Sequence, residues 1–480
     1  MIQIEVIQPV PKAGPAVRER FPSLPFLWWA IGLTLTAGFG QGMLLFLHLA
    51  AGQPSGLWWL AAGQAHGHVQ LFGWAGMFAL GIGLFFLPRL RGCPAPSARA
   101  VRTAAWLMGS GLTVRALAQP TVAALGPSAL QSGAGLALAL SGLLELAGAG
   151  LAVGALVVAG RQGPPLAGRT GLLAVIPFVV TFVVSLVLAL VVNAIALATD
   201  ARTSGLVPGA ADWTIVHLGL VGMLVPIVAA VSARTFPLYL RLRVPTPREL
   251  YAVFGLYLAG FLSRSTSAFD LPPALQMLPA LGSVILGLAL IGIMVAVDVP
   301  FRRTLRTRAG QEWPAVSEYR ASDWAIFSAY SWLGVAGVLM VFEGLAWWEL
   351  TPRPPLDAER HALGAGLVTL LILGMAIRMV PGFSGRKLYS ARLVWATVWL
   401  GNGAAMLRVL PLFVPSSRVT MSLLGLAGLL GLAAVSCLGW NLWQTVHRPT
   451  SSDGEAVAAR APRCARVRSR AGDSSVPSQR

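Results

Sequence analysis

The stretch His66-Gly-His68-Val-Gln-Leu-Phe-Gly-Trp74 decides the fold of this 480-residue chain. It opens an apolar segment that runs on to Pro88. A segment of that length can cross a hydrocarbon core of about 30 Å as a helix, because each residue adds about 1.5 Å. The segment therefore predicts a membrane-spanning helix with two histidines at its outer end.

The same pattern occurs three times along the chain. A histidine is followed 20 residues later by a proline, and that proline is followed 27 residues later by an arginine. The three sets are His68, Pro88 and Arg115; His217, Pro237 and Arg264; and His361, Pro381 and Arg408. Matching intervals in three copies indicate an internal repeat, and such repeats decide the architecture of a chain.

The composition places the repeats in a membrane. The chain is 56% hydrophobic and 11% charged, whereas soluble domains carry roughly 25% charged residues. Twelve apolar spans are predicted, so each repeat contains four helices and the fold class is an all-α, polytopic membrane protein. The spans cover residues 24–50, 66–88, 103–125, 129–159, 171–197, 213–239, 249–269, 273–298, 323–348, 361–382, 391–413 and 419–443.

The predicted organisation has five parts. A cytoplasmic N-terminal tail (1–23) precedes three four-helix arcs around a pseudo-threefold axis, and a disordered basic tail follows. The arcs cover residues 24–160, 171–298 and 323–443, and the tail covers 449–480.

The loops set the expected orientation. Arginines follow every even-numbered span, whereas the other loops are uncharged or mixed, and cytoplasmic loops carry the excess of basic residues. We therefore expect a multi-pass protein of the bacterial inner membrane with both termini in the cytoplasm. The net charge of +18 is explained in the same way, so no nucleic-acid partner is expected. The three cysteines (Cys93, Cys437 and Cys464) form no CxxC pair.

The histidines within the spans are the main functional candidates, because ionisable groups inside a membrane are usually functional. His66, His68, His217 and His361 could hold a metal or haem, since imidazole is a common ligand. Helix capping at the water interface is the competing interpretation. His66 and His68 are separated by roughly 200° of helical rotation, so they should face different ways.

The arginines and acids within the predicted spans also have both a functional and a structural interpretation. Arg115, Arg264 and Arg408 could pair with haem propionates in bidentate geometry, or extend to the outer interface. Glu145 and Glu343 could carry protons or pair with an arginine.

Two motifs resemble those of the NnrS family of haem- and copper-containing membrane proteins linked to nitric oxide stress. The first is the opening stretch from His66 to Trp74. The second is His361-Ala-Leu-Gly-Ala-Gly, continued by Gly374-Met375-Ala376-Ile377-Arg378 and Ser384-Gly385-Arg386. The arrangement of helices and histidines also resembles the main subunit of haem–copper oxidases.

The resemblance implies haem b near the outer face, with His68 and His361 as axial ligands and His66 as a further candidate. It implies that His217 lines an open or second metal position, and that copper could bind. Two departures concern copper. No histidine lies between His217 and His361, and Phe383 stands where the family commonly has another histidine.

The implied function is a role in nitric oxide or related redox metabolism, with the lipid bilayer, an electron-donor protein or quinol, and a small gas such as nitric oxide as partners. The chain could be an oxidoreductase acting on nitric oxide or oxygen. It could instead be an electron-transfer or gas-sensing subunit without turnover. A non-redox anion transporter is the alternative from another class.

Overall fold

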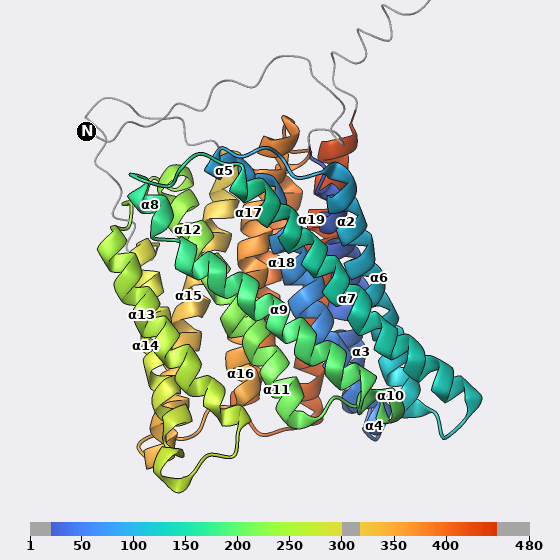
Figure 1. Cartoon of the computed structure of the whole chain (residues 1–480). Helices are drawn as coiled ribbons and strands as arrows, with labels where there is room; N and C mark the ends of the chain where they lie inside the picture. Colours follow the sequence, from blue (N-terminus) through green and yellow to red (C-terminus); the bar gives the residue numbers. More distant parts are fainter. Residues whose placement is uncertain (1–20, 300–316, 449–480) are drawn as a thin grey trace, which may run out of the picture.

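The computed structural model describes residues 21–299 and 317–448 and shows a bundle of long helices (Figure 1). Large apolar side chains point outward from it: Leu117, Leu130 and Ile195 are 68%, 67% and 59% exposed. Such a surface would be a liability in water but suits lipid. Most of the predicted N-terminal tail, the Arg302–Arg308 loop and the 449–480 tail lie outside the described residues.

The first half of the bundle begins with two interrupted helices, α2–η1–α3 (Leu24–Leu33, Thr34–Gly38, Phe39–Ala50) and α4–η2–α5 (Leu57–His68, Val69–Gly76, Met77–Arg91). They are followed by α6 (Ala98–Ala124), α7 (Ala129–Arg161), α8 (Thr170–Leu173), α9 (Ile176–Ala198), α10 (Ala201–Ser204) and α11–η3–α12 (Gly209–His217, Leu218–Leu224, Val225–Tyr239).

The second half begins with α13 (Pro247–Ser265), η4 (Thr266–Ala268), η5 (Pro273–Leu275), α14 (Leu278–Val297), α15 (Ser317–Leu345) and η6 (Ala346–Trp348). It ends with α16–η7–α17 (Leu356–His361, Ala362–Thr369, Leu370–Ser384), α18 (Ala391–Val409), η8 (Leu410–Phe413) and α19 (Arg418–His447).

The expectation of an all-α, polytopic membrane protein is confirmed. Within the described residues, ten helices are long and apolar enough to span a bilayer. The helices α6 and α13 are not among those ten, and both carry several charged residues, including Arg115 and Arg264. Part of this polarity is buried in the interior of the bundle, at Arg115 and Arg264, and part is exposed near the helix starts, at Arg99, Arg102 and Arg248.

Three helices form the centre of the bundle. In the most apolar window of Leu57–Arg91, Gly209–Tyr239 and Leu356–Ser384, 78%, 78% and 83% of the residues are buried. The other seven candidate spans have 33–56% of the window buried. These inner helices are the ones that contain His68, His217 and His361.

Each inner helix changes its hydrogen-bond pattern directly after its histidine. His68, His217 and His361 are the last α-helical residues before the π-helical segments η2, η3 and η7. These three segments contact one another at the centre of the bundle. π-Helical turns are uncommon and frequently occur at functional sites. A fourth π-helical segment, η1, interrupts the outer helix α2–η1–α3, so the threefold repeat and its boundaries stay a prediction.

The structure corrects the position of the histidines within their helices. The sequence predicts them at the helix heads, but α4 begins at Leu57, about two and a half turns before His66. The helix that contains His361 begins at Leu356, about one and a half turns earlier. The helical turns that precede the histidines are less apolar than the predicted spans. Hydropathy alone therefore does not assign them to the membrane helices.

The two ends of the bundle differ. Figure 1 shows α4, α11 and α16 at one end, called the α16 end, and α5 and α17 at the other, called the α17 end. At the α17 end, α5 and α17 carry Pro88 and Pro381 in their last turns and stop at glycines with left-handed backbone, Gly92 (φ 76°) and Gly385 (φ 65°). Glycine adopts that conformation without steric cost.

Candidate functional site

A cavity of about 440 Å³ lies between the inner helices α4–η2 and α16–η7 and the outer helices α3, α18 and α19. Pockets of this size hold small organic ligands and cofactors. Its wall includes His66 and His361 but not His68 or His217. We call it the His66–His361 cavity.

Both cavity histidines are held through the same ring nitrogen. Nδ1 of His66 lies 2.9 Å from the carbonyl oxygen of Gly38, and Nδ1 of His361 lies 2.7 Å from that of Asp357. A carbonyl can only accept, so each Nδ1 donates and the neutral tautomer leaves a lone pair on Nε2. Among the described residues, Nε2 of neither ring has a hydrogen-bond partner. A backbone bond at the remote nitrogen is the usual way in which a protein orients a metal-ligating histidine.

Glycines leave part of the cavity wall flat. Gly63 and Gly67 are one turn apart on α4, Gly364 lies on η7, and all three line the cavity. A Cβ atom added at any of them would meet no atom within 4 Å. The wall therefore has room for a broad, flat ligand. Trp74 and Thr369 also line the cavity, and Nε1 of Trp74 donates to Thr369 Oγ1 at 3.2 Å.

The charges on the wall come from Arg408, Arg360, Asp212 and Asp357. Arg360 and Asp357 form a long ion pair of 3.9 Å. The guanidinium of Arg408 lies 4.5 Å from the centre of the Phe46 ring, and its buried Nη1 has no hydrogen-bond partner. An unpaired buried donor costs about 1–3 kcal/mol, and a carboxylate on a ligand in the cavity would remove that cost.

His68 is directed to another part of the bundle. Its Nε2 lies 2.5 Å from Glu145 Oε2 of α7, and both side chains are buried. The two neighbouring histidines therefore face different ways, as their spacing predicts. The structure does not bring His68 and His361 to one cavity, because residue 68 is turned toward α7 by the helical rotation from residue 66.

Arg115 is also turned away from the His66–His361 cavity. It is 1% exposed and donates to Gln119 Oε1 at 3.0 Å and to Asn193 Oδ1. Gln119 in turn donates to Gln64 Oε1 at 3.1 Å. Arg115 therefore belongs to a polar layer that links α6, α9 and α4, and it is not placed to meet a ligand in the cavity.

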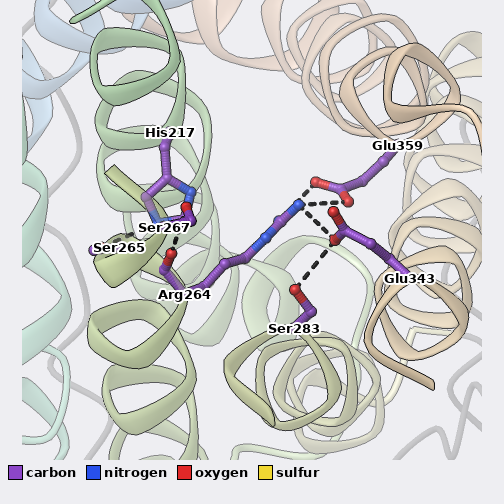
Figure 2. A network of polar contacts seen from close by, with 7 residues as sticks. All are labelled: His217, Arg264, Ser265, Ser267, Ser283, Glu343 and Glu359. Atoms are coloured by element: carbon purple, nitrogen blue, oxygen red, sulfur yellow. Dashed lines mark hydrogen bonds and ion pairs between the residues drawn. The ribbon is translucent and has the colours of Figure 1, made fainter. Parts of the chain in front are cut away.

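Arg264 is paired with two acids. Its Nη1 and Nη2 donate to the two carboxylate oxygens of Glu359 at 2.8 and 2.9 Å, and Nη2 also donates to Glu343 Oε2 at 2.8 Å. Ser283 Oγ donates to the same Glu343 oxygen at 3.1 Å. Figure 2 shows this group, which we call the Arg264 cluster, with the guanidinium directed toward both carboxylates. These pairs occupy Arg264, so it is not free for a propionate.

His217 lies beside this cluster and is packed between two aromatic rings. Trp213 and Phe261 stack on it with ring centres at 4.7 and 5.1 Å. Nε2 of His217 lies 3.2 Å from Ser265 Oγ (Figure 2). That hydroxyl donates to the carbonyl of Phe261, so its oxygen can accept from His217. This arrangement leaves little room for the metal position predicted for His217.

The structure offers no multi-ligand copper site in the part it describes. Residues 21–299 and 317–448 contain no group of three or more His, Cys, Asp or Glu side chains that could hold a metal ion. Phe383, at the position of the expected extra histidine, packs on Phe85 and Phe21 at ring distances of 4.3 and 5.7 Å near the α17 end. These residues do not fit copper, so copper binding stays a prediction without a site.

Glu359 was missed as a site residue by the sequence reasoning, which placed it in a loop. The sequence does contain a signal for a helix start before Glu359, because Pro354 and Pro355 directly precede Leu356-Asp-Ala-Glu-Arg-His361. Proline before acidic residues is typical of a helix start. The pairing of Glu359 with Arg264, 95 residues away in the chain, left no signal in the sequence.

Comparison with known proteins identifies a family and one local relative. The family model described as NnrS protein matches residues 24–450. A stretch of 90 residues is 36% identical to a nitric oxide reductase subunit of Stutzerimonas stutzeri. That match covers 18% of this chain and 19% of the relative. It is therefore local.

Proposed function

The chain belongs to the NnrS family, and we propose on that basis that it is a membrane haem protein acting in nitric oxide-linked redox metabolism. The proposal for nitric oxide rests on the family and on the local similarity to a nitric oxide reductase subunit. The proposal for haem rests on one observation. Two histidines with Nδ1 bound to backbone carbonyls and Nε2 unpaired line the same cavity.

The chemistry of the residues that line the cavity would suit haem b. His66 and His361 would hold it through their imidazoles, and Arg408 would pair with a propionate through Nη1. The open wall at Gly63, Gly67 and Gly364 would leave room for it. This assignment replaces His68 by His66 as a proposed ligand.

The ligand set indicates the class of chemistry. Held by two imidazoles, haem would supply a one-electron couple suited to electron transfer. The chain itself contributes the orientation of both rings, the charge of Arg408 and an apolar wall that limits water. We therefore favour an electron-transfer role, with a quinol or a protein as electron donor.

We also propose that the α17 end faces the cytoplasm of a bacterial plasma membrane. Arg89 and Arg91 end α5, and Arg386 and Lys387 follow α17. Basic residues near span ends mark the cytoplasmic side. The His66–His361 cavity would then lie in the outer half of the membrane.

The test is a reduced-minus-oxidised absorption spectrum of the purified full-length protein, with iron and copper analysis. We expect bound iron and a bis-imidazole spectrum. His66→Ala or His361→Ala should lower bound haem by more than about tenfold, since even losing an outer-shell partner costs ten- to hundredfold. His68→Gln is the matched control and should retain the spectrum.

Three results would contradict parts of the proposal. Loss of the spectrum in His68→Gln with retention in His66→Ala would restore His68 as the ligand. Absence of iron from the wild-type protein would favour the non-redox anion transporter. Anaerobic nitric oxide consumption by membranes that contain the protein, above membranes that lack it, would indicate an enzyme.

A further inference from the structure

The segment α16 carries His361 at the start of a long helix. It comprises Leu356–His361, begins directly after Pro354 and Pro355, and continues through the π-helical segment η7 into α17. The first four N–H groups of a helix have no partner within the helix, so the first turns are held less firmly than the middle. Tertiary contacts to α16 therefore help to fix its position, and with it the direction of the His361 ring.

One such contact joins α16 to α13. Glu359 is 4% exposed, and both of its carboxylate oxygens accept from Arg264, at 2.8 and 2.9 Å. Glu359 and His361 are two residues apart, which is roughly 200° of rotation on a helix. The ion pair therefore holds one face of α16 while the opposite face presents the histidine to the cavity.

Arg264 is itself a rigid anchor. The backbone of α14 packs tightly against it, since a Cβ atom added at Gly282 would collide with the backbone nitrogen of Arg264. At its other end, the guanidinium is held by Glu343 of α15, which also accepts from Ser283 (Figure 2). Contacts from two helices thus fix Arg264 before it meets Glu359.

We infer that Arg264 is a positioning residue for His361. Its bidentate pair with Glu359 holds α16 so that Nε2 of His361 is presented to the His66–His361 cavity. The inference deepens the proposed function and rests on it for the role of His361 as a ligand. Arg264 belongs to the second predicted repeat, whereas Glu359 and His361 belong to the third. Arg264 would thus set the orientation of a cavity residue without lining the cavity itself.

The chain offers a matched pair of variants for the test. Glu359→Gln and Glu343→Gln each remove one negative charge from the same guanidinium, but only residue 359 lies on α16. In haem-free protein, hydrogen–deuterium exchange of amides 356–369 should be about ten- to hundredfold faster in Glu359→Gln, as expected for weakening a charge-assisted hydrogen bond. Glu343→Gln should change this exchange by less than about threefold, because the bidentate pair with Glu359 remains.

The haem-loaded protein supplies the second measurement. Glu359→Gln should change the electron paramagnetic resonance spectrum of the ferric haem and its reduction potential, because both follow the orientation of the axial imidazole. Glu343→Gln should leave both close to wild type. Glu359→Asp, which keeps the charge, should recover part of the wild-type signal.

The outcomes separate the two proposals. Equal effects of the two glutamine variants on exchange and on the haem spectrum would overturn the positioning role, because the cluster would then act only as a general stabiliser. Absence of haem from the wild-type protein would overturn the proposed function. In that case, faster exchange confined to Glu359→Gln would still establish that Arg264 holds α16, and equal exchange would exclude it.

Discussion

The His66–His361 cavity and the Arg264 cluster contain corresponding residues of the repeated pattern, yet they differ in what they leave free. In the cavity, neither Nε2 of His361 nor the buried Nη1 of Arg408 has a hydrogen-bond partner in the part of the chain that the structure describes. In the cluster, Arg264 is paired with two carboxylates and His217 is stacked between two rings. The repeated spacing places basic groups at corresponding positions, but their neighbours decide which of them can meet a ligand.

The acids explain most of this difference. Glu343 and Glu359 come from α15 and α16 and reach Arg264 across the interface between two predicted repeats. Among the described residues, Arg408 forms no ion pair within 4 Å: the ring of Phe46 lies beneath its guanidinium, and Asp357 interacts with it over a longer distance. An arginine that is neutralised within the protein stabilises the fold, whereas one left without a carboxylate can bind an anionic group of a ligand.

The largest effect should come from filling the cavity. Gly63→Phe places a ring in open space, since a Cβ atom there meets nothing within 4 Å. We expect haem binding to fall below detection in a haem titration, with little change in the thermal midpoint of the haem-free protein. Gly150→Phe is the control, because Gly150 is equally open but lies on the exposed surface of α7. Normal haem binding by Gly63→Phe would show that the ligand lies elsewhere.

The next effect compares the two arginines directly. Arg264→Gln leaves two largely buried carboxylates without a cation and should cost about 3–5 kcal/mol in the unfolding free energy of haem-free protein. Arg408→Gln should cost less than about 1 kcal/mol, since Arg408 makes no ion pair within 4 Å among the described residues. It should instead weaken haem binding by about ten- to hundredfold, as expected for a lost charge-assisted bond.

Denaturant unfolding in mild detergent and a haem titration measure these two quantities. The comparison between the regions breaks down if Arg408→Gln destabilises the haem-free protein as much as Arg264→Gln does.

The smallest effect concerns His217. Ser265→Ala removes the hydroxyl 3.2 Å from Nε2 of His217 and should lower stability by about 0.5–1.5 kcal/mol. The haem spectrum should be unchanged, because His217 does not line the cavity. A shifted haem spectrum in Ser265→Ala would mean that His217 is a ligand despite its stacked position.

The candidate site was predictable in part. The pattern of histidines identified all three inner helices, and helical rotation predicted that His66 and His68 face opposite ways. It did not predict which of the two faces the cavity. That depends on which face of α4 turns toward α16 and which toward α7, and a helix that is buried on nearly all sides has no polar face to show its orientation.

The arginines illustrate the same limit. Arg115, Arg264 and Arg408 were equivalent candidates for a propionate, and only Arg408 lines the cavity. The partners of the other two lie 78 and 95 residues away in the chain, at Asn193 and Glu359. Such distant pairs are fixed by the packing of helices from different parts of the chain.

The sequence by itself determined the membrane class and the approximate course of the apolar spans, because hydropathy and helical period are local properties, although the inner helices begin earlier than the predicted spans. Only the tertiary structure decided that His66 shares a cavity with His361, that His68 pairs with Glu145, and that Arg264 is neutralised. The physical reason is that a charge or an imidazole is available to a ligand only if no neighbour satisfies it first, and neighbours are set by packing.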